Sequence, residues 1–400
     1  MTAAPAVNFN RACPVCGGLG GENLSPLNFA VYDGSPLSGA FDLVACRDCG
    51  LTFYDLAEGP ETVEAYYRFN AYYATSSTPG AGGQSPEDLV HQRDIVARLA
   101  PFAPPAAFTR TVCDLGCGRG GLLEELRRAG YRSLLGVDLL PESVSAVKSR
   151  GLPAAEGSAA APPLAGLEPG LLIYSHVLEH LWDPAGALAE ARRHLEAQGL
   201  IYVEVPDAST YEADIPFQQL YLEHLNHFDP AALAALLSRA GFAPLALARG
   251  RFPLPGGRSI GIIWAVARPA STPAPAVFPA GEARAALPDY LAASRAHPAL
   301  ALIAELAENK KPLQIWGLSQ MTMLLMGSSP LARANVHGFI DRDPFKLSRT
   351  VRGLPVRPPE SLTVGQSGDD VLLTVWGQAE PMRRQLSAQG FAGRVWSLSD

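Results

Sequence analysis

Residues 111–138 read TVCDLGCGRGGLLEELRRAGYRSLLGVD, and the fold class follows from the order of their patterns. An apolar run leads into a glycine-rich turn, an amphipathic stretch, and a second apolar run that ends in Asp138. This order predicts strand, turn, helix and strand, the first half of an α/β sheet that binds a nucleotide-like cofactor. Asp138 follows Asp114 by 24 residues, and a carboxylate at this strand tip can accept two hydrogen bonds from a ribose diol.

The glycines of the turn have a physical role. A strand that turns sharply into a helix needs residues without Cβ, because the backbone enters the left-handed region and a ligand approaches it closely. The spacing is D-x-G-x-G-x-G and not the dinucleotide pattern G-x-G-x-x-G, and the chain has no P-loop motif. A purely structural glycine loop is the alternative interpretation.

With this loop, the chain resembles the class I S-adenosylmethionine-dependent methyltransferases, over roughly residues 111–266. The segments Glu156–Ala159, Tyr174–Leu181 and Leu195–Pro206 continue the resemblance in order, although Ser158 stands where that family often has Asp. The resemblance implies S-adenosylmethionine as cofactor. By match, it would be bound by Asp114, Gly116, Cys117, Gly118, Asp138, Leu139, Ser158, Ala159, Ser175 and His176.

Size and charge restrict the class of protein. Four hundred residues predict two or three domains. The sequence contains no run of 18 apolar residues, so it predicts no membrane-spanning helix. The first nine residues lack the pattern of an export signal, so we expect a cytoplasmic protein. A net charge of −7 argues against a nucleic-acid partner, which makes a methyltransferase acting on RNA the weakest alternative.

Four of the six cysteines form two C-x-x-C pairs, Cys13/Cys16 and Cys46/Cys49. A glycine follows each pair and permits the tight knuckle that turns backbone N–H groups toward sulfur. Four thiolates complete a tetrahedral site, so we expect a structural Zn²⁺. Disulfides are the alternative, which a cytoplasmic location disfavours.

These patterns predict an α/β protein in three parts. Residues 1–75 form a zinc-binding module, residues 76–268 the Rossmann-like methyltransferase core, and residues 282–400 a smaller α/β domain for substrate recognition. Residues 269–281 are rich in Pro and Ala and read as a linker, and residues 76–85 as a mobile loop. In the last part we expect one helix over 282–308 and strands near 313–317, 336–341 and 371–375.

The densest polar and aromatic cluster is Tyr221–Phe228, which reads YLEHLNHF. It follows the fifth predicted strand, at the sheet edge where ligands bind in open α/β folds. His224 is a candidate general base, Glu223 or another acid could orient it, and Tyr221 could donate to a developing oxyanion. A set of structural side chains at a helix start fits the sequence equally well.

The order of zinc module, methyltransferase core, Y-x-E-H segment and C-terminal α/β domain resembles the nucleotide-sugar C-methyltransferases. This resemblance implies catalytic roles for Tyr221, Glu223, His224, His180 and Tyr73, with His224 as the base. It implies methylation of the carbon beside a keto group on a nucleotide-linked deoxysugar, by a monomer or homodimer without a catalytic metal. Two departures from the family concern the substrate: residues 317–322 lack the usual lysine, and the arginine near 256–260 is displaced. The alternatives are an O- or N-methyltransferase for another small molecule and a non-catalytic scaffold that retains the fold.

Overall fold

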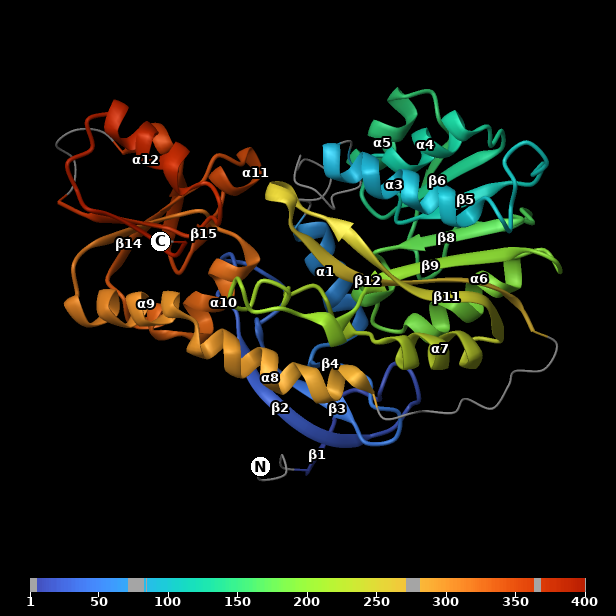
Figure 1. Ribbon diagram of the computed structural model, residues 1–400, viewed down its shortest axis with the longest axis horizontal. Coiled ribbons are helices and arrows are strands. Elements are labelled where there is room, and N and C mark those ends of the chain that lie inside the picture. The colour runs from blue at the N-terminus through green and yellow to red at the C-terminus, as the bar shows by residue number, and fades with distance from the viewer. Residues whose placement is uncertain (1–5, 71–82, 84, 271–280, 363–367, 400) are drawn as a thin grey trace.

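The computed structural model describes residues 6–70, 83, 85–270, 281–362 and 368–399. These residues form three sheets, each in its own part of the chain (Figure 1). The fold is α/β, with an N-terminal antiparallel sheet, a central mixed sheet and a C-terminal mixed sheet. Tyr73 and nearly all of the proposed loop and linker lie outside the described residues.

The N-terminal sheet contains a strand from a distant part of the chain. Its order is β1-β2-β3-β4-β10, and all its pairs are antiparallel. The fifth strand comes from the central domain, where it directly follows the Y-x-E-H segment. The strands of the N-terminal sheet are β1 (Ala6–Asn8), β2 (Gly20–Asn28), β3 (Ala40–Cys46), β4 (Thr52–Asp55) and β10 (Asn226–His227). Helix α1 (Pro60–Phe69) follows β4 in the chain.

The central sheet has the order β11-β12-β9-β8-β5-β6-β7. The five strands from β9 to β7 are parallel, and the β11–β12 hairpin is antiparallel. Its strands are β5 (Val112–Leu115), β6 (Leu134–Asp138), β7 (Ala154–Glu156), β8 (Leu171–Ser175), β9 (Leu200–Pro206), β11 (Phe242–Pro253) and β12 (Ser259–Pro269). Its helices are α3 (Pro86–Leu99), α4 (Gly121–Ala129), α5 (Pro141–Ser149), α6 (Pro184–His194) and α7 (Pro230–Arg239), with short 3₁₀ turns η1 (Leu178–His180), η2 (Ala208–Thr210) and η3 (Pro255–Gly257).

The C-terminal sheet has the order β15-β16-β14-β13-β17-β18, and only β15 is antiparallel. The single helix expected over 282–308 is two helices, because His297 is extended and Pro298 begins the second one. Its strands are β13 (Leu313–Trp316), β14 (Val336–Ile340), β15 (Thr350–Val351), β16 (Leu354–Arg357), β17 (Asp370–Leu373) and β18 (Val395–Ser397). Its helices are α8 (Glu282–Ala296), α9 (Pro298–Asn309), α10 (Gln320–Ser328), α11 (Pro344–Leu347) and α12 (Ala379–Ala388), with η4 (Pro330–Arg333) and η5 (Pro359–Ser361).

The N-terminal sheet shares hydrophobic cores with both other parts. One buried cluster joins Leu43 and Tyr54 to Leu287 and Leu325 of the C-terminal helices. A second cluster joins the four paired cysteines and Phe53 to Leu236 and other residues of the central domain. The three parts therefore fold against one another, and the N-terminal sheet is the common support (Figure 1).

None of the helices in the described part of the chain has the length and apolar character that crossing a bilayer requires.

Candidate active site

The glycine-rich turn has the backbone that the sequence predicts. Gly116, Gly118 and Gly120 all have positive φ, at 79°, 50° and 79°. A Cβ on Gly116 would lie 2.6 Å from Cγ2 of Val177, so this position requires glycine. Helix α4 begins after Gly120 without a side-chain cap, which leaves its first N–H groups available to a ligand.

Asp138 ends β6 beside this turn. Its Oδ2 accepts a hydrogen bond from the backbone N–H of Gly118 at 2.8 Å, and its Oδ1 accepts one from Leu140 at 2.9 Å. Each carboxylate oxygen has a second lone pair for a ribose hydroxyl. Burial raises the pKa of Asp138, against the effect of these hydrogen bonds. Burial, followed by the charge of Asp138, raises the pKa of Asp114 to about 7. The turn, the open helix start and the strand-tip acid fit an adenosyl cofactor.

The remaining predicted cofactor residues occupy the same carboxyl edge. Ser175 ends β8, and His176 follows with a φ of 54°, which is rare outside glycine and typical of functional sites. Burial alone would lower the pKa of His176, but Glu179 and Glu204 raise it to about 10. Leu139, Ser158 and Ala159 follow the ends of β6 and β7, and Cys117 is buried within the loop.

Glu204 is a buried carboxylate that the sequence reasoning did not single out. It is fully buried on β9 and contacts His91 Nε2 at 2.7 Å and Arg98 Nη1 at 2.5 Å. Burial would raise its pKa, but His91 and His176 hold it well below its usual range. Because Arg98 already supplies a cation, this cluster forms an internal ion-pair network.

The predicted catalytic histidines lie together. The rings of His180 and His224 are 4.7 Å apart, and the rings of Tyr221 and His224 are also 4.7 Å apart. Burial and the charges of His180, His227 and His176 hold the pKa of His224 well below its usual range, so its imidazole is neutral at pH 7. The η1 turn that carries His180 follows Val177, which contacts the cofactor loop at Gly116. The histidine pair therefore lies beside the predicted cofactor loop.

A tyrosine other than the predicted Tyr73 reaches this pair. The hydroxyl of Tyr67, on α1, is hydrogen-bonded to Nδ1 of His180. The same Nδ1 lies 3.1 Å from the backbone oxygen of Glu223. Tyr67 belongs to the aromatic run at residues 66–73, which is the only sequence signal that could have found it.

The carboxylate of Glu223 points toward the C-terminal domain. Its Oε2 accepts a hydrogen bond from Nε2 of Gln320 at 2.9 Å, and Gln320 is the first residue of α10. The C-terminal domain thus contacts the predicted catalytic segment directly. No pattern around Gln320 in the sequence indicates this contact.

The predicted segment is held in place from two sides. Oδ1 of Asn226 accepts a hydrogen bond from Nη2 of Arg11 at 2.8 Å, and Nδ2 of Asn226 donates to the backbone oxygen of Leu181 at 2.8 Å. The N–H of Tyr54 on β4 donates to the oxygen of Leu225 at 2.9 Å. The N-terminal sheet therefore fixes the segment that carries His224, next to the turn that carries His180.

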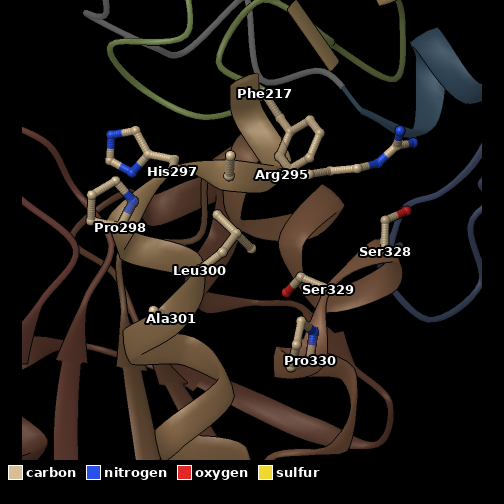
Figure 2. A pocket seen from close by; sticks show the side chains of 10 residues that line it. Phe217, Arg295, His297, Pro298, Leu300, Ala301, Ser328, Ser329 and Pro330 are labelled. Atoms are coloured by element: carbon tan, nitrogen blue, oxygen red, sulfur yellow. The ribbon is translucent and has the colours of Figure 1, made fainter. Parts of the chain in front are cut away.

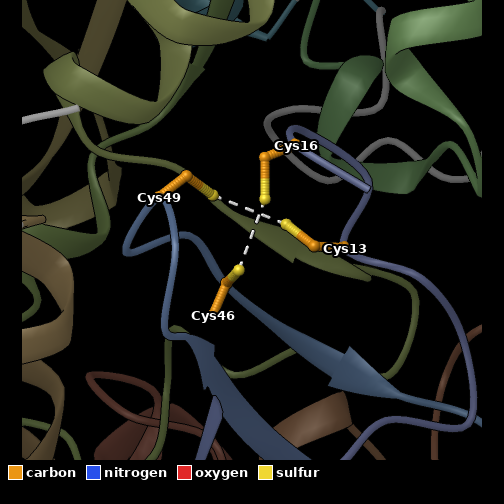
Figure 3. Close-up of side chains that lie close together, drawn as sticks. All are labelled: Cys13, Cys16, Cys46 and Cys49. Atoms are coloured by element: carbon orange, nitrogen blue, oxygen red, sulfur yellow. Dashed lines mark hydrogen bonds between the residues drawn. The ribbon is translucent and has the colours of Figure 1, made fainter. Parts of the chain in front are cut away.

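The four paired cysteines converge on one point (Figure 3). Sγ of Cys13 and Cys49 are 3.5 Å apart, and Sγ of Cys16 and Cys46 are 3.4 Å apart. Four sulfurs at about 2.3 Å from a tetrahedral zinc would be about 3.8 Å apart, so the cluster fits this ion. The backbone N–H of Gly18 points at Sγ of Cys16, at 3.4 Å.

A cavity of about 460 Å³ lies elsewhere, where the α8–α9 junction faces η4 (Figure 2). None of the predicted site residues lines it. Phe217, four residues before Tyr221, is its contact with the central domain.

Comparison with known proteins identifies the central part of the chain. A protein-family model described as a methyltransferase domain matches residues 89–247. These residues form a class I S-adenosylmethionine-dependent methyltransferase domain. The Gly116 turn and Asp138 lie within the matched residues.

Several curated proteins match part of this chain, and two of them illustrate the range. A Mycobacterium tuberculosis protein named "Probable S-adenosylmethionine-dependent methyltransferase" is 30% identical over 157 residues, which cover 38% of this chain and 54% of the relative. The ubiquinone biosynthesis O-methyltransferase of Methylococcus capsulatus is 33% identical over 99 residues, which cover 23% of this chain and 42% of the relative. The chain thus spans about half the length of the curated relatives it matches.

Among solved structures, an N-methyltransferase of Burkholderia thailandensis that acts on 1,6-didemethyltoxoflavin is similar. Its identity to this chain is 20%, the match covers 56% of this chain and 97% of that one, and the TM-score is 0.39.

Proposed function

We propose that this protein transfers a methyl group from S-adenosylmethionine to a carbon beside the keto group of a nucleotide-linked deoxysugar. The observation that carries the proposal is the neutral, partly buried imidazole of His224, whose ring lies 4.7 Å from that of His180. A neutral imidazole is a competent base for a C–H proton next to a carbonyl. The order of the three parts of the chain supports a sugar nucleotide as acceptor.

The residues of the site have distinct roles in this proposal. S-adenosylmethionine, when bound, supplies an electrophilic methyl group. The Gly116 turn and Asp138 hold its adenosine, and His224 removes the proton from the acceptor carbon. Tyr221, whose ring packs on His224, donates to the oxygen on which negative charge develops. Closeness of acceptor and methyl donor provides much of the remaining rate.

Zinc would be held by Cys13, Cys16, Cys46 and Cys49, and its role would be structural. Four protein ligands leave no open position for a substrate. The metal would stabilise the N-terminal sheet, which in turn holds Leu225 and Asn226.

The test combines proton exchange with methyl transfer. A panel of nucleoside-diphosphate 4-keto sugars is incubated in deuterium oxide, with and without S-adenosylmethionine, and the products are examined by mass spectrometry. We expect exchange of the proton beside the keto group without the methyl donor, and one added methyl group with it. His224→Ala should lower both rates roughly 10²–10⁴-fold and leave cofactor affinity intact.

Three outcomes would count against this proposal. Exchange that persists in His224→Ala would move the base to His180 or His227. Methylation at oxygen or nitrogen without exchange would favour the alternative of an O- or N-methyltransferase for another small molecule. Tight cofactor binding without any methyl transfer would favour a non-catalytic scaffold.

A further inference from the structure

A buried carboxylate lies among the histidines of the predicted active site. Glu179, in η1, has an exposed fraction of 1%, and its Oε1 lies beside Nδ1 of His176, whose pKa this carboxylate raises. Burying a carboxylate is costly unless an opposite charge or a hydrogen-bond donor compensates it, and His176 provides that compensation while the acceptor is unreacted. The roles proposed above for the site do not yet include this carboxylate.

Three imidazoles surround this carboxylate. Its Oε1 lies 3.3 Å from Nδ1 of His176 and 3.9 Å from Nε2 of His180. Ring nitrogens of His180 and His224 lie within 4.8 Å of it and of each other. By contrast, Glu223 directs a carboxylate oxygen to Gln320 of the C-terminal domain.

The charge balance of the site explains why His224 needs an anion. His224 is surrounded by His176, His180 and His227, with Tyr67 and Tyr221 beside them, and the first three disfavour a proton on it. If His224 takes a proton from the acceptor, a partly buried imidazolium forms beside other imidazoles. An opposite charge within about 4–6 Å stabilises such a cation, and Glu179 is the carboxylate at this distance.

We propose that Glu179 is the charge partner of His224, and that it stabilises the imidazolium formed when His224 takes the acceptor's proton. The acceptor C–H bond breaks, its electron pair enters the enolate, and the proton forms an N–H bond on His224. Glu179 acts through the histidine and touches no reacting atom, so it is a positioning residue. The inference rests on the proposed function and adds to it the identity of the acid that supports the base.

The test compares two substitutions at Glu179 with a matched one at Glu190. Glu179→Gln keeps the shape and removes the charge, whereas Glu179→Asp keeps the charge and shortens the side chain. Glu190→Gln removes a carboxylate from α6, where Glu190 pairs with the surface residue Arg193. Each variant is assayed for exchange with the keto sugar that the wild type exchanges, for kcat and KM, for cofactor affinity, for thermal stability and for metal content.

We expect Glu179→Gln to lower exchange and kcat together, roughly 100-fold, with KM and cofactor affinity within about twofold of wild type. Glu179→Asp should recover part of both rates, and Glu190→Gln should match the wild type. If Glu179→Gln fails to fold, the partial loss in Glu179→Asp carries the test, because a merely structural role would lower stability without a selective loss of exchange.

Two results would overturn the inference. Exchange within threefold of wild type in a folded Glu179→Gln variant would show that the charge has no role. A second bound metal ion that is lost in Glu179→Gln would show that Glu179, His180 and His224 ligate a metal instead. If the wild type exchanges no keto sugar at all, the proposed function fails first, and this result is distinct from exchange that depends on His224 but not on Glu179.

Discussion

The central and C-terminal sheets contain the same local arrangement, yet only one has the features of a ligand site. In each, a strand ends at a glycine with positive φ, Gly116 at 79° and Gly317 at 109°. In each, an acid at the end of the neighbouring strand, Asp138 as the last residue of β6 and Asp341 directly after β14, accepts hydrogen bonds from two backbone N–H groups. Asp138 accepts from Gly118 and Leu140, and Asp341 accepts from Leu318 and Asp343.

The two arrangements differ in what fills the remaining positions. Helix α4 begins without a side-chain cap, whereas the hydroxyl of Ser319 caps α10 by accepting the N–H of Thr322. Lys346 also binds Asp341, with 3.0 Å between Nζ and Oδ2. Two residues before the glycine, the central sheet has Asp114 and the C-terminal sheet has the buried apolar Ile315.

This difference shows why a shared backbone does not imply a shared ligand. A ligand needs polar groups that the chain itself leaves unsatisfied. The C-terminal arrangement satisfies its own groups and turns Gln320 toward Glu223. It therefore supports the active site of the methyltransferase domain, and the comparison predicts no second cofactor site there.

The largest effect is expected from losing the zinc site of the N-terminal sheet, which packs against both the central and the C-terminal parts. Cys46→Ser should remove zinc and most soluble protein, because metal-binding energy in such sites is folding energy. Elemental analysis and soluble yield provide the measurement, and Cys113→Ser, in the cofactor strand, is the control that should retain one zinc per chain. Full yield of a zinc-free Cys46→Ser protein would show that the N-terminal sheet does not support the other two.

The next effect concerns Asp114, which stands two residues before the glycine of the central sheet, where the C-terminal sheet has Ile315. The pKa of Asp114 is raised from 3.8 to about 7 in the folded chain, so the folded state binds its proton more tightly than the unfolded state. The contribution of this group to the free energy of unfolding is full below pH 4 and is lost as pH rises to about 7. The loss is about 4 kcal/mol, because each unit of pKa difference corresponds to about 1.36 kcal/mol.

Asp114→Asn should therefore be more stable than wild type at pH 8 and similar to it at pH 4. Denaturant unfolding of the cofactor-free protein at both pH values measures this difference. An equal stability difference at the two pH values would mean that Asp114 does not titrate in this window.

The smallest effect compares the two strand-tip acids. Asp138→Ala should weaken S-adenosylmethionine binding by about 1.5–3 kcal/mol, because it removes a charged hydrogen-bond acceptor. Asp341→Ala should leave this affinity within about twofold and lower thermal stability instead. Calorimetry with S-adenosylmethionine and with NAD measures both variants. A loss of cofactor affinity in Asp341→Ala, or tight NAD binding to the wild type, would break the comparison.

Local sequence patterns determined much of this structure. The spacing of apolar residues and glycines predicted the helix α4 and the strand β6 that ends in Asp138, because the turn, the helix face and the strand tip lie within 28 consecutive positions. The C-x-x-C pairs predicted the cysteine cluster, because each pair has the ligand spacing of a zinc site and two such pairs supply its four ligands. The boundary at Pro298 was missed, although proline at the first position of a helix is a local signal.

Contacts between distant segments were decided by the tertiary structure alone. Pairing of β10 with β4 joins residues 226–227 to residues 52–53, and no local pattern indicates which edge strand receives a two-residue strand. Tyr67 reaches His180, and Gln320 reaches Glu223, across 113 and 97 residues of sequence. Sequence spacing determines which side chains share a helix face or a strand, whereas packing of whole sheets determines which of those faces meet. That packing left Glu179 among three histidines and turned Glu223 away toward the C-terminal domain.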